Sequence, residues 1–71
     1  MTYQAIEFDS ADEALQHANA ASGEAILLYG QPLVVSQDDA HRLHAAGVEF
    51  AYLVDHDLPD GTSRILSIPV N

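Results

Sequence analysis

The sequence predicts an α+β domain with the element order β-α-β-β-α-β-β, in which two helices pack on one face of a four- to five-stranded sheet. Two serines, Ser10 and Ser36, each stand three residues before an acidic residue and ahead of apolar residues at helical spacing, which is typical of a capped helix. Short apolar runs bounded by glycine, proline or aspartate indicate the strands. The 71 residues suffice for one hydrophobic core, so residues 1–71 are expected to form a single domain.

The first strand and the first helix are expected before Gly23. Residues Tyr3–Phe8 form the predicted strand. The hydroxyl of Ser10 then caps the helix by accepting a hydrogen bond from the amide of Glu13, and Gly23 is a natural C-terminal stop. Small apolar residues at helical spacing form the inner side of this helix: Ala11, Ala14, Leu15, Ala18 and Ala21.

A hairpin is expected between the two helices. Residues Ala25–Tyr29 are apolar but too few for a buried helix, so they predict an inner strand. The segment Gly30–Pro32 is typical of a turn, and Leu33–Val35 is the expected partner strand.

The second helix is expected to begin after Ser36, which has Asp39 at the third following position. Its predicted inner face carries Ala40, Leu43 and His44, with Ala46 as a further candidate, and Gly47 ends it.

A second hairpin is expected at the end of the chain. Residues Val48–Val54 and Thr62–Val70 form its strands, and Leu58–Gly61 has strong turn chemistry. Because Pro69 cannot donate to a strand ladder, the last strand is expected at an edge of the sheet.

Two segments of the chain resemble each other. Residues 8–14 and 34–40 align at a spacing of 26 and each precedes a helix, a glycine and a strand. This pattern fits two β-α-β halves of a split, ferredoxin-like sheet, and it equally fits two helices with the same capping chemistry.

The last hairpin is the candidate interaction surface. Its strands carry apolar residues on both faces, and two short helices packed on one face would leave the other face uncovered. We therefore expect a homodimer in which a second copy supplies the cover. The candidate residues are Phe50, Tyr52, Leu66 and Ile68, with the acidic residues Glu49, Asp55 and Asp57 around them.

The net charge of −9 comes from eleven carboxylates against two arginines, with no lysine. Phosphate contacts need clustered lysine and arginine, so we expect no binding to nucleic acid. The lack of basic residues equally argues against binding to anionic membranes. A basic protein is the partner class that the charge favours. No apolar run approaches the roughly 20 residues that span a bilayer, and the acidic N-terminus lacks the basic region of a signal peptide. With no cysteine, the expected setting is the cytoplasm.

The motifs of catalysis are missing from the sequence, and we expect no enzyme and no cofactor. The serines do not lie in a G-x-S-x-G elbow, and neither phosphate-binding glycine loop is present. His41 and His44 lie three residues apart on the second predicted helix, and a metal there would need a third ligand such as His56. The acidic segment Asp55–Gly61 does not match the spacing of a calcium loop. We therefore expect no metal site.

Residues 22–43 resemble the N-terminal half of prevent-host-death type antitoxins. The shared pattern is a glycine followed by an apolar strand, a glycine hairpin, a second strand begun by proline and a capped helix, here Gly23–Tyr29, Gly30–Pro32, Leu33–Val35 and Ser36–Leu43. The resemblance implies a homodimer that binds operator DNA and neutralises a toxin through a C-terminal segment. This chain has no basic residue at the turn Tyr29–Gln31, and its C-terminal part is predicted to be a hairpin, so no functional residue carries over.

Three functions follow as hypotheses. The first is a small acidic, non-enzymatic protein-interaction module that forms a homodimer. The second is an antitoxin-like or anti-repressor regulator of a basic protein. The third is a histidine-based metal-binding protein.

Overall fold

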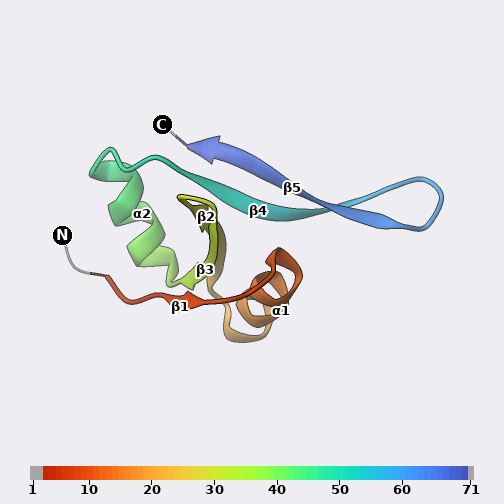
Figure 1. Cartoon of the computed structure of the whole chain (residues 1–71), viewed down its shortest axis with the longest axis horizontal. Helices are drawn as coiled ribbons and strands as arrows, with labels where there is room; N and C mark the ends of the chain where they lie inside the picture. Colours follow the sequence, from red (N-terminus) through yellow and green to blue (C-terminus); the bar gives the residue numbers. More distant parts are fainter. Residues whose placement is uncertain (1–2, 71) are drawn as a thin grey trace.

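A computed structural model describes residues 3–70 of the chain (Figure 1). It contains the predicted α+β class and element order, with two helices and one five-stranded sheet. The strands are ordered β1-β3-β2-β4-β5, and all neighbouring strands are antiparallel. The elements are β1 (Ile6–Glu7), α1 (Ala11–Ala21), β2 (Glu24–Leu28), β3 (Gln31–Val35), α2 (Gln37–Ala45), β4 (Phe50–Asp57) and β5 (Ser63–Val70).

The two helices lie on opposite faces of the sheet, so the prediction that both pack on one face is wrong. α1 connects β1 to β2, which flank β3, and α2 connects β3 to β4, which flank β2. Each connection advances two positions across the sheet in the direction of β5. The strands from which they start, β1 and β3, run in opposite directions. Two connections of the same handedness must then pass over opposite faces. In Figure 1, β2 and β3 lie between the helices.

Neighbouring residues of the inner strands enter two separate cores. Ala25 of β2 and Val34 of β3 pack on the side of α1. Their neighbours Ile26 and Leu33 pack on the side of α2. Successive side chains of a strand point to opposite faces, so both faces of β2 and β3 are buried. The α1-side core contains Ala14, Leu15, Ala18, Ala25, Val34 and Leu53, and the α2-side core contains Ile26, Leu28, Leu33, Val35, Ala40, Leu43 and Phe50.

Both helices begin at the predicted serine caps. The Ser10 hydroxyl accepts from the Glu13 amide at 3.3 Å, and the Ser36 hydroxyl accepts from the Asp39 amide at 3.1 Å. The left-handed residue that ends α1 is Ser22, with φ of 56°, and not Gly23 as predicted. Position 23 is glycine for a different reason, because a Cβ there would lie 3.0 Å from the carbonyl oxygen of Val35.

The end and the inner face of α2 also refine the prediction. Gly47 follows the C-cap residue of α2 with φ of 77°, as expected of a helix stop. The buried residues of α2 are Ala40 and Leu43, whereas His44 is exposed. The inner face is therefore narrower than the helical spacing predicted.

The turn of the first hairpin lies one residue earlier than predicted. Tyr29 and Gly30 both have positive φ, 50° and 80°, and join the paired residues Leu28 and Gln31. A two-residue loop of this kind matches the right-handed twist of the flanking strands. Tyr29 is consequently 89% exposed, although the sequence predicted it as part of a strand.

The predicted first strand is mostly irregular. Within Tyr3–Phe8 only Ile6 and Glu7 pair as a strand, opposite Val34 and Leu33. The second hairpin is longer than predicted on its first strand, since β4 continues through Asp57. Its partner β5 forms the other edge of the sheet, as Pro69 predicted.

Candidate functional site

The α2-side face of the β4–β5 hairpin is apolar along most of its length. The register pairs Tyr52 with Ile68 and Val54 with Leu66 on this face. We call these four residues the hairpin strip. The α2-side core packs against Tyr52 but does not include the other three, and Leu66 and Ile68 are 38% and 51% exposed. The hairpin extends beyond both helices (Figure 1), and within residues 3–70 Leu66 and Ile68 are the exposed part of the strip.

One predicted surface residue belongs to the core instead. Phe50 is only 6% exposed, within the α2-side core. Its ring meets that of Tyr52 edge-on at a centroid distance of 5.3 Å. Phe50 therefore packs against Tyr52 of the strip from within the core and does not form part of the surface.

The acidic residues do not surround the strip as predicted. Asp55 and Asp57 pair with Ile65 and Ser63, and this alternate register position puts them on the α1-side face. Glu49 precedes β4, at the opposite end of that strand from the turn. The strip ends instead at the paired residues His56 and Arg64. Sequence reasoning left Val54 and Arg64 out of this surface, although Val54 lies two positions from Tyr52 and Arg64 two positions from Leu66, so each shares a face with a residue that was named.

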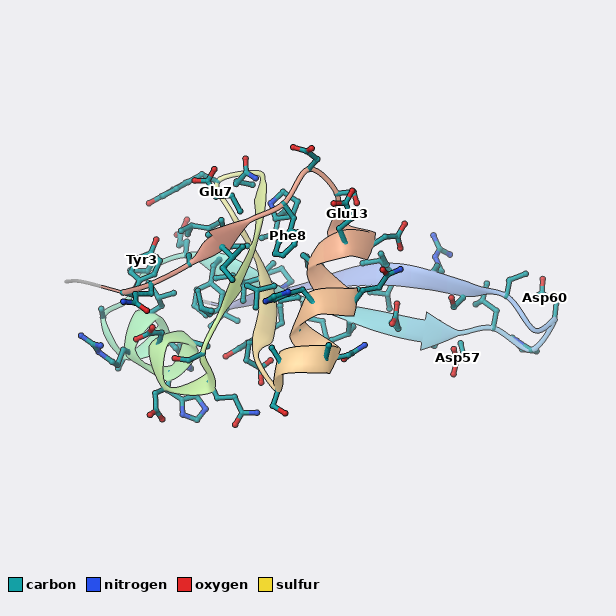
Figure 2. All side chains as sticks on the ribbon, turned by 90° about the horizontal axis from the view of Figure 1, so that it is seen from below. Tyr3, Glu7, Phe8, Glu13, Asp57 and Asp60 are labelled. Atoms are coloured by element: carbon teal, nitrogen blue, oxygen red, sulfur yellow. The ribbon has the colours of Figure 1, made fainter. Side chains whose placement is uncertain are left out.

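The hairpin turn uses its acidic residue internally. The Gly61 amide donates to the Leu58 carbonyl at 3.1 Å, and the Leu58 amide donates to the Thr62 carbonyl at 2.8 Å. The Asp60 carboxylate accepts from the hydroxyl and the amide of Thr62 at 2.6 Å and 3.0 Å, and these bonds hold the pKa of Asp60 below its usual value. Figure 2 shows Asp57 and Asp60 near this end of the hairpin. The turn therefore lies at Leu58–Gly61, as the sequence predicted, whereas Asp55 and Asp57 belong to β4.

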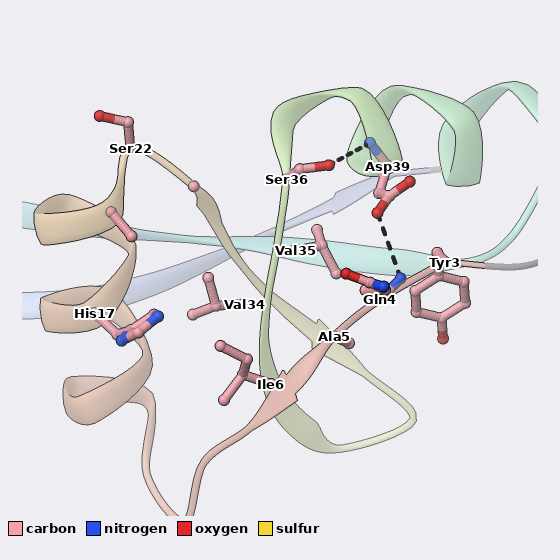
Figure 3. Close-up of a pocket in the computed structure, with 12 residues that line it drawn as sticks. Tyr3, Gln4, Ala5, Ile6, His17, Ser22, Val34, Val35, Ser36 and Asp39 are labelled. Carbon is pink, nitrogen blue, oxygen red and sulfur yellow. Dashed lines mark hydrogen bonds between the residues drawn. The ribbon is translucent and has the colours of Figure 1, made fainter.

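A pocket of about 750 Å³ lies between β1 and the two helices (Figure 3). Its polar groups are already engaged in local structure: Ser36 caps α2, and Asp39 accepts from the Gln4 amide at 3.4 Å and from Arg42 at 3.2 Å. Figure 3 shows His17 on the other side of Val34 from Asp39. Within residues 3–70, every buried side-chain nitrogen and oxygen has a hydrogen-bond partner. The pocket therefore offers no unpartnered buried group for a ligand.

The histidines are distributed over the fold. His41 and His44 lie on α2, whereas His56 lies near the far end of the hairpin. The ring of His17 packs against that of Phe8, with 5.3 Å between the ring centroids. Among the described residues, no group of three or more potential ligands could hold a metal ion. The structure does not bring the predicted candidates together.

Comparisons with known proteins place the chain in no family. No family model, curated protein or solved structure that was compared with the chain matches it. In the part of the chain that the structure describes, no helix is long and apolar enough to cross a membrane.

Proposed function

We propose that this chain is a small, non-enzymatic protein-interaction module that forms a homodimer through its β4–β5 hairpin. The observation that carries the proposal is the hairpin strip, where Leu66 and Ile68 are exposed while the chain's own helices cover both faces of the inner strands β2 and β3. Exposed apolar residues that adjoin one another commonly mark an interaction site.

The distribution of charge favours a second copy as the occupant of the strip. The chain carries a net charge of −9, but β5 contains no carboxylate, and Asp55 and Asp57 face away from the strip. Two copies can therefore bring their strips together without placing acidic groups next to each other. A basic protein would be drawn to the other face of the hairpin, and it remains the partner class that the overall charge favours.

The remaining hypotheses gain no support from the described residues. No observation adds to the antitoxin-like regulator, and the separation of His41 and His44 from His56 gives no reason to favour a metal-binding protein. The lack of cysteine supports a cytoplasmic setting for the homodimer.

Ile68→Ser is expected to weaken the homodimer by about tenfold or more, because each dimer loses two buried isoleucines. The measurement is the mass in solution by light scattering after size exclusion, at low and high salt over a dilution series. The matched control is Ile6→Ser, which removes an isoleucine with the same 51% exposure from the opposite edge strand and should leave the dimer intact. A monomeric wild-type chain, or an unchanged dimer in Ile68→Ser, would contradict the proposal.

A further inference from the structure

The backbone of β5 has one side free for pairing. The amide of Leu58 donates to the Thr62 carbonyl, which makes these two residues a hydrogen-bonded pair of the hairpin. Hydrogen-bonded and non-hydrogen-bonded pairs alternate along an antiparallel ladder. Counting along the register from this pair, Arg64, Leu66 and Ile68 bond to β4. The residues between them therefore direct their backbone groups outward, and these are Ser63, Ile65, Ser67 and Pro69.

The free side of β5 lacks most of the features that protect an edge strand. Natural edges are commonly short, charged or bulged, because an open row of amides and carbonyls can pair with another chain. β5 has eight residues with a single charge, Arg64, whereas β1 at the other edge has two residues. Pro69 protects one outward position near its end, since proline has no amide hydrogen.

We propose that β5 pairs antiparallel with β5 of a second copy, so that the two sheets join into one, with Leu66 on the two-fold axis. The inference rests on the proposed homodimer and specifies how it is built. A two-fold axis makes the contact self-complementary, so each residue pair occurs twice. Leu66 and Ile68 each gain a neighbour on the flank that is open in the single chain.

In an antiparallel pair of β5 strands, each outward residue must meet an outward residue of the second copy. Of the registers that meet this condition, three overlap the most residues of 63–69, and their centres are Ile65, Leu66 and Ser67. The centre at Ser67 places Pro69 opposite Ile65 and loses a donor at both positions, leaving the fewest hydrogen bonds. The centre at Ile65 keeps the donors but overlaps only residues 63–67 and places Ile68 opposite Thr62, outside β5.

The centre at Leu66 is favoured by both overlap and side chains. It pairs the whole stretch 63–69 of one copy with the same stretch of the other. Pro69 faces Ser63 at each end of this stretch, so each of these two end pairs lacks the one hydrogen bond that an amide at position 69 would donate. It also brings Leu66 opposite Leu66 of the second copy in a non-hydrogen-bonded pair, where facing side chains are closest. Ile68 then packs along the aliphatic stem of Arg64 of the second copy.

The chain contains no cysteine, so single cysteines report the register directly. Facing residues of a non-hydrogen-bonded pair have Cα atoms about 4.5 Å apart, within reach of a disulfide. Leu66→Cys is therefore expected to form a disulfide-linked dimer under mild oxidation. In Ile65→Cys and Ser67→Cys the two cysteines lie diagonally, about 7–8 Å apart, and should cross-link at least about tenfold more slowly. The control for random collision is Tyr29→Cys, at an 89% exposed position in the turn between β2 and β3, outside the paired stretch of β5.

The outcomes separate the pairing from the homodimer itself. Faster cross-linking at Ile65 or Ser67 than at Leu66 would overturn the register. A dimeric Leu66→Cys chain that cross-links no faster than Tyr29→Cys would overturn the edge pairing and leave the homodimer standing, because two sheets packed face to face are about 10 Å apart. A monomer would contradict both.

A second variant tests the edge without cysteine. Ser67→Pro removes an outward amide and leaves the ladder to β4 intact, so we expect a folded monomer by circular dichroism and light scattering. A folded Ser67→Pro dimer of unchanged affinity would overturn the edge pairing.

Discussion

Ile26→Ala is expected to remove most of the stability of this domain. Ile26 has no exposed surface, and it pairs with Leu33 on one side and Tyr52 on the other in the middle of the sheet. Replacing a fully buried isoleucine by alanine typically costs about 2–5 kcal/mol, through lost burial and the cavity that remains. A domain of this length has roughly 4–11 kcal/mol in total, at about 0.05–0.15 kcal/mol per residue.

Urea unfolding followed by circular dichroism measures this effect. The wild-type chain and the variant must be compared at equal protein concentration, because dimer formation makes apparent stability depend on concentration. Ile6→Ala is the matched control, since Ile6 is 51% exposed on the short edge strand β1, and it should cost well under 1 kcal/mol, about the range of surface substitutions. A loss of less than about 1 kcal/mol for Ile26→Ala would contradict a sheet buried on both faces.

Leu43→Ala is expected to release α2 from the sheet at a cost of about 2–5 kcal/mol. The structure describes all of α2, and its buried side chains are the small Ala40 and the large Leu43, which is 1% exposed. A helix of nine residues is not stable by itself in water, so its helical state depends on this attachment.

Amide hydrogen exchange separates local release from general unfolding. In Leu43→Ala, the amides of α2 should lose protection by a larger factor than those of α1, whose core is on the other face of the sheet. Arg42→Ala is the control, because it removes only an exposed ion pair with Asp39, worth about 0–1 kcal/mol. Equal loss of protection in both helices would mean that α2 does not unfold as a separate unit.

Local signals in the sequence were sufficient for most of the elements. The hydroxyls of Ser10 and Ser36 define the starts of the helices through contacts within three residues, so no distant part of the chain is needed to predict them. The turn at Tyr29 was placed one residue late, because a tyrosine with positive φ is unusual and the sequence offered Gly30 and Pro32 as conventional turn residues.

The placement of the helices depends on pairing between distant strands, which local patterns do not contain. The helices were predicted on one face, but that arrangement would leave one side of β2 and β3 bare. Residues Ala25–Leu28 and Leu33–Val35 are apolar at consecutive positions, and such runs are typical of strands buried on both faces. This signal was sufficient to indicate two covers from the chain itself.

The candidate site was predicted in part. Tyr52, Leu66 and Ile68 do share one face of the hairpin, because they lie at matching positions of the two strands. The placement of Asp55 and Asp57 beside them ignored the two-residue period of a strand, which puts odd and even positions on opposite faces. The burial of Phe50 required knowledge of where α2 packs, and the sequence did not contain it.

The two helical connections, β1–α1–β2 and β3–α2–β4, each cross over one strand of the other, and this arrangement also constrains the order in which the chain folds. Most of the strand residues in the two cores belong to β2 and β3. These two strands are joined by only two residues, so their pairing costs little conformational entropy. We expect the transition state for folding to contain this hairpin. The kinetic φ-value, which is the fraction of a mutation's effect on stability that already appears in the folding rate, should then be near 1 around Gly30 and near 0 around Asp60, at the tip of the second hairpin. Substitutions near Gly30 should then slow folding, whereas those near Asp60 should accelerate unfolding, and stopped-flow kinetics would show the reverse if the second hairpin formed first.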